Sequence, residues 1–312
     1  MYLQCLRGFA SLLVFLNHFN GWVIGYLSVW FFFSLSGYLL IKKVMTKKIS
    51  FRGYLVNRIY RLLPTYFVVQ ILTIILLLLF YRDFYIQNPK QIIKEFLTFF
   101  MIIHIPNFYN TMSVFNSALW SLQLEFYFLF LIYFLRSKNF FLLILFFSIF
   151  LHIFFYFNLE IWPHHYPSFF YNLIFIMGGI FCYFYSKKLK IKITIILPLI
   201  IIIIYSSFYF TNDNIQIGLK YGPIFFSIIF IFIIKYFSDK DKKKIKNNAL
   251  IPLYFLGSIS YPMYLTHKPI LNIVRNFNFF NLGSLEEFFI ISFLTIAISY
   301  ALHLYVENRY RY

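Results

Sequence analysis

The sequence predicts an all-α fold, a polytopic transmembrane helical bundle of about ten spanning helices with both termini in the cytoplasm. The chain has 312 residues, of which 61% are hydrophobic and only 12% are charged. Soluble proteins are about 45–50% apolar and about 25% charged, so this chain has too few charges to cover a water-exposed surface. Because no stretch is polar enough to fold alone, we expect residues 1–312 to form a single membrane domain.

Ten apolar segments are long enough to cross a bilayer, which requires roughly 20 mostly apolar residues per helix. They lie at about 5–22, 26–42, 62–81, 117–135, 139–157, 169–186, 193–211, 218–236, 249–271 and 287–306.

The basic residues predict the orientation of these spans. The formal net charge is +18, from 28 Lys and Arg against 10 Asp and Glu. With the N-terminus inside, most of the basic residues fall in the loops 42–61, 136–138, 187–192 and 235–246 and in the C-terminal tail, which this topology places in the cytoplasm. Positively charged loops stay on the cytoplasmic side of a membrane. The charge therefore indicates topology, and we expect no nucleic-acid partner.

One further apolar segment, 96–105, would reverse every later loop if it crossed. Ten residues of helix are roughly 15 Å long, about half the thickness of the hydrocarbon core. We therefore expect an interfacial or re-entrant piece within a long outer loop, 82–116. The two cysteines, Cys5 and Cys182, fall near predicted cytoplasmic helix ends, so we expect neither a disulfide nor a zinc site.

Ionisable side chains within a membrane are costly and usually mark function. The first predicted helix carries Arg7 and His18, roughly 16 Å apart along its axis and about three turns from one another, so both share one face. A neutral histidine can act as a base near pH 7. In the alternative, structural interpretation, Arg7 reaches the cytoplasmic interface and His18 hydrogen-bonds a neighbouring helix.

Glu125 and an arginine pair extend this set. A membrane carboxylate must be neutral or paired, so Glu125 either pairs with an arginine or orients His18. Arg58 and Arg61 are three residues apart on one helical face near the cytoplasmic interface. They serve either as ordinary positive-inside anchors or as a phosphate site, for which arginine geometry is well suited.

Other polar positions are weaker candidates. His267 lies late in the ninth span, either in the same cavity as His18 or at the interface. Glu307 follows the last span, where pairing with a cytoplasmic arginine is its structural role. Ser34, Ser36 and Gly37 form a small-residue patch, which usually serves close helix packing. His164 and His165 in an outer loop are adjacent, a poor arrangement for a metal site, and we expect no metal.

Taken together, these patterns resemble acyltransferase family 3, the bacterial integral-membrane acyltransferases, in the form without a fused esterase-like domain. The matching motifs occur in the family's order over nearly the whole chain: Arg7-Gly8 with His18, Phe32–Leu40, Arg58–Pro64, Trp120–Tyr127 and Gly257–His267. One departure is Trp30, where many relatives carry an acid in the second helix.

The resemblance implies transfer of an acyl group, usually acetyl from cytoplasmic acetyl-CoA, to a hydroxyl of a cell-envelope carbohydrate such as O-antigen, capsule or exopolysaccharide. It implies a bacterial cytoplasmic (inner) membrane location, with membrane lipid around the chain. His18 would be catalytic, with Arg7 and Glu125 supporting it. Arg58 and Arg61 would bind acyl-CoA, and a third set of residues would contact substrate, namely Trp120, Tyr261 and His267.

Several questions stay open at this level. His18 could accept a proton from the sugar hydroxyl or could carry the acyl group itself. The main alternative function is a transporter or flippase of lipid-linked glycans, although the paired repeats and broken helices of transporters are not evident. A glycan polymerase would predict larger outer loops.

Overall fold

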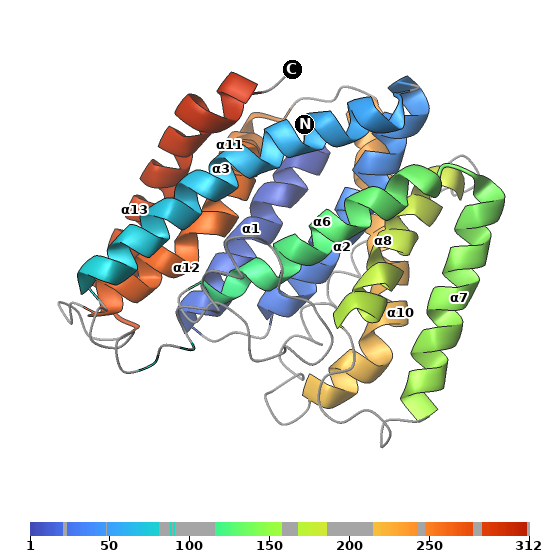
Figure 1. Cartoon of the computed structure of the whole chain (residues 1–312), viewed down its shortest axis with the longest axis horizontal. Coiled ribbons are helices and arrows are strands. Elements are labelled where there is room, and N and C mark those ends of the chain that lie inside the picture. Colours follow the sequence, from blue (N-terminus) through green and yellow to red (C-terminus); the bar gives the residue numbers. More distant parts are fainter. Residues whose placement is uncertain are drawn as a thin grey trace. The chain divides into compact units, whose positions relative to one another are not determined.

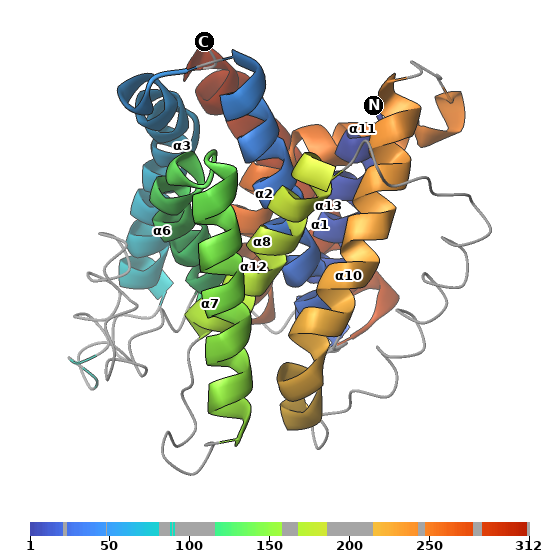
Figure 2. The same ribbon diagram turned by 90° about the vertical axis from the view of Figure 1, so that its right-hand side faces the viewer.

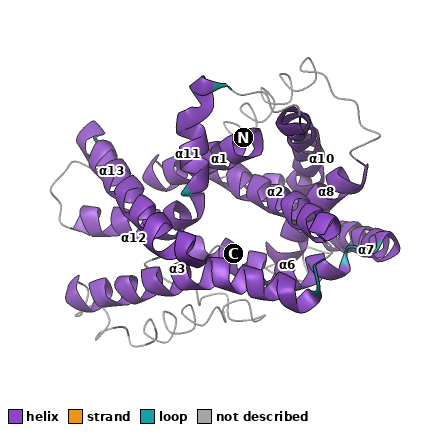
Figure 3. Ribbon diagram, turned by 90° about the horizontal axis from the view of Figure 1, so that it is seen from above, coloured by secondary structure: helices purple, strands orange, loops and turns teal. Residues whose placement is uncertain are grey.

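The structure, a computed structural model, describes residues 1–20, 24–47, 49–80, 88, 90, 116–157, 168–185, 215–242, 247–276 and 283–310. Within these ranges every regular element is a helix and no strand occurs (Figure 3). The predicted all-α class is therefore confirmed for the described part of the chain.

Ten α-helices lie in the described ranges, coloured from blue to red along the chain in Figure 1. They are α1 (Tyr2–Asn20), α2 (Ile24–Lys47), α3 (Phe51–Phe80), α6 (Trp120–Phe134), α7 (Lys138–Phe157), α8 (Ser168–Tyr185), α10 (Ile215–Lys242), α11 (Ile251–Ser258), α12 (Ser260–Asn276) and α13 (Leu285–Leu302). The remaining turns are three 3-10 turns, Ser117–Leu119, Asn248–Leu250 and Asn308–Tyr310, and a π-helical turn, His303–Glu307, that continues α13.

Helices occupy each predicted span that falls in the described ranges, whereas the span at 193–211 and the outer segment 96–105 lie outside them. Among the described residues, three helices are both long and apolar enough to cross a membrane: Leu27–Lys47, Phe51–Phe80 and Leu285–Glu307. Shorter apolar helices cover Leu124–Phe134, Lys138–Leu151 and Asn172–Tyr185. The described part of the chain thus has the all-helical, apolar character of a membrane protein.

The predicted ninth span, 249–271, differs from the structure, which has two helices there. α11 ends at Ser258 and α12 begins at Ser260, with a turn at Ile259 between them. Pro262 has no N–H to donate to the carbonyl of Ser258, four residues earlier, so the regular ladder of hydrogen bonds is interrupted at this point. α12 is much less apolar than α11, and the prediction of one continuous span overlooked both this change and the proline.

The third helix also begins earlier than predicted. α3 starts at Phe51 rather than near residue 62, so its first turns precede the apolar stretch. The exposed Arg52 lies in the first turn, and both Arg58 and Arg61 lie within the helix. The two arginines therefore project from a rigid element rather than from a loop.

The helices form two compact units. The first comprises residues 1–17, 21–51 and 128–257, and the second comprises residues 18–20, 52–127 and 258–312. In the first unit α8 packs against α2, α7 and α10, and Figure 2 shows these helices side by side. In the second unit α12 packs against α13.

Glycines allow α2 and α8 to pack backbone against backbone. A Cβ atom on Gly37 would lie 2.4 Å from the carbonyl oxygen of Ile176, and one on Gly179 would lie 1.8 Å from the carbonyl oxygen of Ser34. Both distances are far below van der Waals contact, so only glycine permits this approach. The predicted packing role of the small-residue patch around Gly37 is confirmed.

The same device joins α1 to α11. A Cβ on Gly8 would lie 2.1 Å from the carbonyl oxygen of Leu253, and one on Gly257 would lie 2.0 Å from the carbonyl oxygen of Gln4. Gly8 and Gly257 belong to the first and last motifs of the family pattern. Although these two glycines are far apart in the sequence, they take part in the same helix–helix contact within the first unit.

Trp30 contributes to the aromatic core of the first unit. Its ring stacks on that of Phe175, with centroids 5.0 Å apart and planes inclined by 16°, and lies 5.9 Å from the ring of Phe226. The position at which many relatives carry an acid is therefore filled here by apolar packing between α2, α8 and α10.

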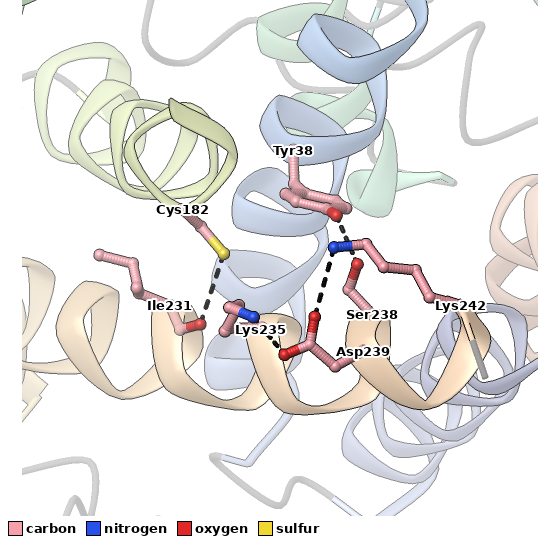
Figure 4. A network of polar contacts seen from close by, with 7 residues as sticks. All are labelled: Tyr38, Cys182, Ile231, Lys235, Ser238, Asp239 and Lys242. Carbon is pink, nitrogen blue, oxygen red and sulfur yellow. Dashed lines mark hydrogen bonds and ion pairs between the residues drawn. The ribbon is translucent and has the colours of Figure 1, made fainter. Parts of the chain in front are cut away.

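A polar network ties the end of α10 to α2 and α8 (Figure 4). The hydroxyls of Tyr38 and Ser238 are 2.5 Å apart, and Lys235 and Lys242 both pair with Asp239. Burial alone would raise the pKa of Asp239, but hydrogen bonds and positive charge from the two lysines outweigh it and hold that pKa below its ordinary value. Asp239 thus stays ionised and holds the last turns of α10 in place.

Replacing Gly179 with alanine tests the backbone contact. Alanine favours helix over glycine by about 1 kcal/mol, so the substitution would stabilise the protein if the site were open. The clash with the carbonyl of Ser34 should instead cost about 1–3 kcal/mol and lower the thermal unfolding midpoint of the detergent-purified protein. Ala297→Val, at an exposed position of α13, adds more bulk and should leave the midpoint unchanged. An unchanged midpoint for Gly179→Ala would contradict the packing described here.

Candidate active site

Most of the residues singled out in the sequence fall in the second compact unit. His18, at the end of α1, belongs to it together with Arg58 and Arg61 of α3, Glu125 of α6, and Tyr261 and His267 of α12. These residues are spread over some 250 positions of the chain. Arg7 lies eleven residues before His18 on the same uninterrupted helix but belongs to the first unit.

His18 and His267 are in contact. Their ring centroids are 5.0 Å apart, with planes inclined by 45°. His267 is buried, with 1% of its surface exposed, whereas His18 is partly exposed. Of the two positions that the sequence left open for His267, in the same cavity as His18 or at the interface, this ring contact favours the first.

The ring of His267 is held from its own helix. Its Nδ1 lies 3.1 Å from the carbonyl oxygen of Met263, one turn earlier. A carbonyl can only accept a hydrogen bond, so Nδ1 carries the proton and, in the neutral ring, Nε2 carries the lone pair. Nε2 is buried and has no hydrogen-bond partner among the described residues.

The residues that precede His267 are each tied to another element. The hydroxyl of Tyr264 donates to the carbonyl of Ala118 and lies 2.6 Å from the hydroxyl of Ser121. The hydroxyl of Thr266 lies 3.0 Å from that of Ser299 on α13. This part of α12 is therefore held between the start of α6 and the last turn of α13.

Asn116 makes a third tie, which sequence reasoning missed. Its Nδ2 donates to the carbonyl oxygen of Leu265 at 3.0 Å. In a regular helix that carbonyl would accept from residue 269, but Pro269 has no N–H. Asn116 therefore supplies the hydrogen bond that Pro269 removes, and it does so two residues before the buried ring of His267.

A second group of polar residues surrounds Glu125. Its charge interacts with Arg58, Tyr54, Tyr261 and Tyr264, which come from α3 and α12. The interaction with Arg58 agrees with the structural interpretation of Glu125 as an arginine partner. The Nε atom of Arg58 is itself buried and has no hydrogen-bond partner within the described ranges.

Tyr261 links this group to the backbone of α3. Its hydroxyl donates to the carbonyl oxygen of Leu62 at 2.7 Å, directly after Arg61. Tyr261 also lies within the electrostatic field of Glu125, Arg61 and Glu307. Tyr261 is therefore bonded to α3 and lies near charged residues of α3, of α6 and of the π-helical turn that follows α13.

Glu307 pairs with Arg61, as its expected structural role requires. Arg61 Nε lies 3.9 Å from Glu307 Oε1, and the other carboxylate oxygen lies 2.6 Å from Nδ1 of His303. Both His303 and Glu307 are buried in the π-helical turn that follows α13. π-helical turns are rare and frequently occur at functional sites.

α13 carries a polar stripe that the sequence reasoning overlooked. Every fourth residue from Glu287 to Glu307 is buried, and all but one of these is polar: Glu287, Ile291, Thr295, Ser299, His303 and Glu307. Four residues exceed one α-helical turn, so such a stripe drifts by about 40° at each step. The wider π-helical turn at the end absorbs part of this drift. The recurrence of polar residues at intervals of four in the sequence could have revealed this buried stripe.

The opposite end of the stripe forms a clasp. Glu287 accepts from Nε of Arg275 at 2.6 Å and from the backbone N–H of Gly283 at 2.6 Å. Arg275 also donates to the carbonyl oxygen of Phe19, one residue after His18, at 3.0 Å. The clasp fixes the end of α1 that carries His18 to α12 and α13.

Three residues named in the sequence analysis have no described side chain. Trp120 begins α6, and only its backbone is described. His164 and His165 lie outside the described ranges. Within the described ranges, no group of three or more His, Cys, Asp or Glu side chains has the arrangement of a metal site.

The tie between Asn116 and Leu265 can be tested by a double-mutant cycle. Asn116→Leu should leave a buried carbonyl unsatisfied, at a cost of about 1–3 kcal/mol, and lower the thermal unfolding midpoint. In a Pro269→Ala background the new N–H can bond to Leu265, so the same substitution should cost clearly less. Equal losses in the two backgrounds, measured by thermal unfolding in detergent, would contradict the assigned role.

Comparisons with known proteins identify the family. The sequence model of acyltransferase family 3, described as an acyltransferase domain, matches residues 2–304. Neither the curated proteins nor the solved structures contain a significant match to the chain. Because the family match covers nearly the whole sequence and the described part is all-helical with long apolar helices, the chain belongs to acyltransferase family 3 and is a membrane acyltransferase.

Proposed function

We propose that this protein transfers an acyl group, in the first instance acetyl, from cytoplasmic acyl-CoA to a hydroxyl of a cell-envelope carbohydrate. One observation carries the proposal. His18, Arg58, Arg61, Glu125, Tyr261 and His267 lie far apart in the sequence, yet all belong to one compact unit. A catalytic base and an anion-binding pair are the two elements that acyl transfer from a CoA thioester requires.

The proposed topology sets the direction of transfer. In this proposal about ten helices span the bacterial cytoplasmic (inner) membrane as one domain, with both termini inside. Arg58 and Arg61, in the first turns of α3, then lie toward the cytoplasm, where anionic acyl-CoA is available. The end of α1 that carries His18 lies toward the outer side, where an envelope carbohydrate would bind.

The roles follow from the chemistry of each side chain. His18 accepts the proton of the acceptor hydroxyl while the oxygen attacks the thioester carbonyl, and the proton ends on the sulfur of the departing CoA. Arg58 and Arg61 hold CoA phosphates, with Glu125 and Glu307 orienting the two guanidinium groups. Tyr261 and His267 line the acceptor end with Trp120. No metal takes part in this scheme.

Substitution of His18 tests the central role. In inverted membrane vesicles supplied with labelled acetyl-CoA and envelope glycans, His18→Ala should lower transfer by at least about 10²-fold, since a positioned general base contributes about 10²–10⁴-fold. Asn20→Ala, at an exposed position two residues later, is the matched control and should retain activity. Equal labelling with wild type and His18→Ala would show that His18 takes no part in the transfer reaction. Glycan movement without labelling would favour a transporter.

Replacement of Arg58 by lysine tests the donor site. Lysine keeps the positive charge but loses the planar fork of donors that binds phosphate in a bidentate manner. The KM for acyl-CoA should rise by about tenfold, equivalent to about 1.4 kcal/mol, with little change in the KM for the acceptor. Arg52→Lys, at an exposed position on the same helix, should change neither constant. A rise confined to the KM for the acceptor would show that Arg58 contacts the acceptor and not acyl-CoA, which would contradict the proposed role.

A further inference from the structure

Beside His18 lies a second histidine, His267, whose environment is unusually well defined. It is buried, its ring is in contact with that of His18, and its Nδ1 proton is committed to the carbonyl of Met263. Its remaining ring nitrogen, Nε2, is buried without a hydrogen-bond partner among the described residues. A buried polar atom without a partner is costly, so an unused acceptor at this position calls for an explanation.

We propose that His267 is a positioning residue that fixes the tautomer of His18. Its Nε2 accepts the N–H of His18, so that the other nitrogen of His18 presents its lone pair to the acceptor hydroxyl. This inference rests on the proposed function, and it adds to it a residue that acts through His18. No hydrogen bond joins the two rings in this structure, and catalytic hydrogen bonds often tighten only when substrate binds.

The surroundings of His267 suit a positioning role. The residues at 264, 265 and 266 are tied to α6, Asn116 and α13, so the ring sits on a backbone that cannot readily shift. The end of α1 that carries His18 is fixed through Phe19 to Arg275. Both partners of the proposed hydrogen bond are therefore held by elements of the same compact unit.

A neutral histidine suits this task within a membrane. A carboxylate would orient His18 equally well, but it would add a full charge to an apolar interior. The neutral imidazole offers an acceptor at Nε2 without that cost, because its proton is engaged by Met263.

The proton balance of the step is complete with these groups. The hydroxyl proton of the acceptor moves to the free nitrogen of His18 as the new C–O bond forms. The N–H of His18 that faces His267 stays in its hydrogen bond, which stabilises the transient imidazolium. The C–S bond of the thioester breaks, and His18 returns the proton to the CoA sulfur. His267 therefore neither gains nor loses a proton over the cycle.

Two amide substitutions separate this role from a purely structural one. The amide of glutamine reaches the position of Nε2, so His267→Gln can still accept from His18. The amide of asparagine reaches only the position of Nδ1, so His267→Asn keeps the contact with Met263 and loses the acceptor. We expect His267→Gln to retain transfer within about tenfold of wild type and His267→Asn to lose about 10²-fold or more, mainly in kcat. A structural role would favour asparagine, and that order of activities would overturn the proposal.

A spectroscopic measurement tests the inference independently of activity. Nitrogen-15 shifts of labelled histidine distinguish the two ring tautomers, and the signals of His18 can be assigned by their loss in His18→Gln. A single His18 tautomer in wild type and in His267→Gln, with a mixture in His267→Asn, would support the proposal. The same tautomer in all three proteins would overturn it. If the tautomers change as expected while wild type transfers no acyl group, the proposed function fails and the coupling of the two rings stands.

Discussion

The need to satisfy every backbone hydrogen bond within the protein is the constraint from which the second unit follows. In hydrocarbon, no water can replace a missing partner. α12 nevertheless contains Pro262 and Pro269, which leave the carbonyls of Ser258 and Leu265 without their usual helical donors. The chain meets this cost with a break after α11 and with the side chain of Asn116. The ties that restore the bonding also hold α12 rigid around His267.

The first unit solves a different problem. Apolar helices surrounded by lipid gain little from hydrophobic burial against one another, so close packing must supply the attraction. Gly8, Gly37, Gly179 and Gly257 provide it by bringing backbones into direct contact. In the second unit, ionisable side chains also pair between elements, Arg61 of α3 with Glu307 after α13 and Arg275 of α12 with Glu287 of α13.

The sequence predicted the fold class, most helix positions and the small-residue packing, because apolar length and glycine content are local properties. It did not predict the division of the ninth span, although Pro262 and the lower hydrophobicity of α12 relative to α11 were available signals. It singled out His18, Arg58 and Glu125 because charge within an apolar run is conspicuous. It passed over Asn116, Arg275 and His303, whose roles depend on partners that only the tertiary structure brings near.

The stripe of buried polar residues on α13 bears on how freely its sequence can vary. Its exposed face, with Phe289, Phe293 and Tyr300, is the apolar face expected toward lipid, and many apolar side chains would serve there equally well. The inward face holds Arg275 at one end and Arg61 at the other, through Glu287 and Glu307. A wholly apolar helix of equal length could still span the membrane, but without Glu287 and Glu307 both arginines would lose their carboxylate partners. The length of α13 and the spacing of its buried polar residues therefore set the distance between the Arg275–Glu287 pair and the Arg61–Glu307 pair.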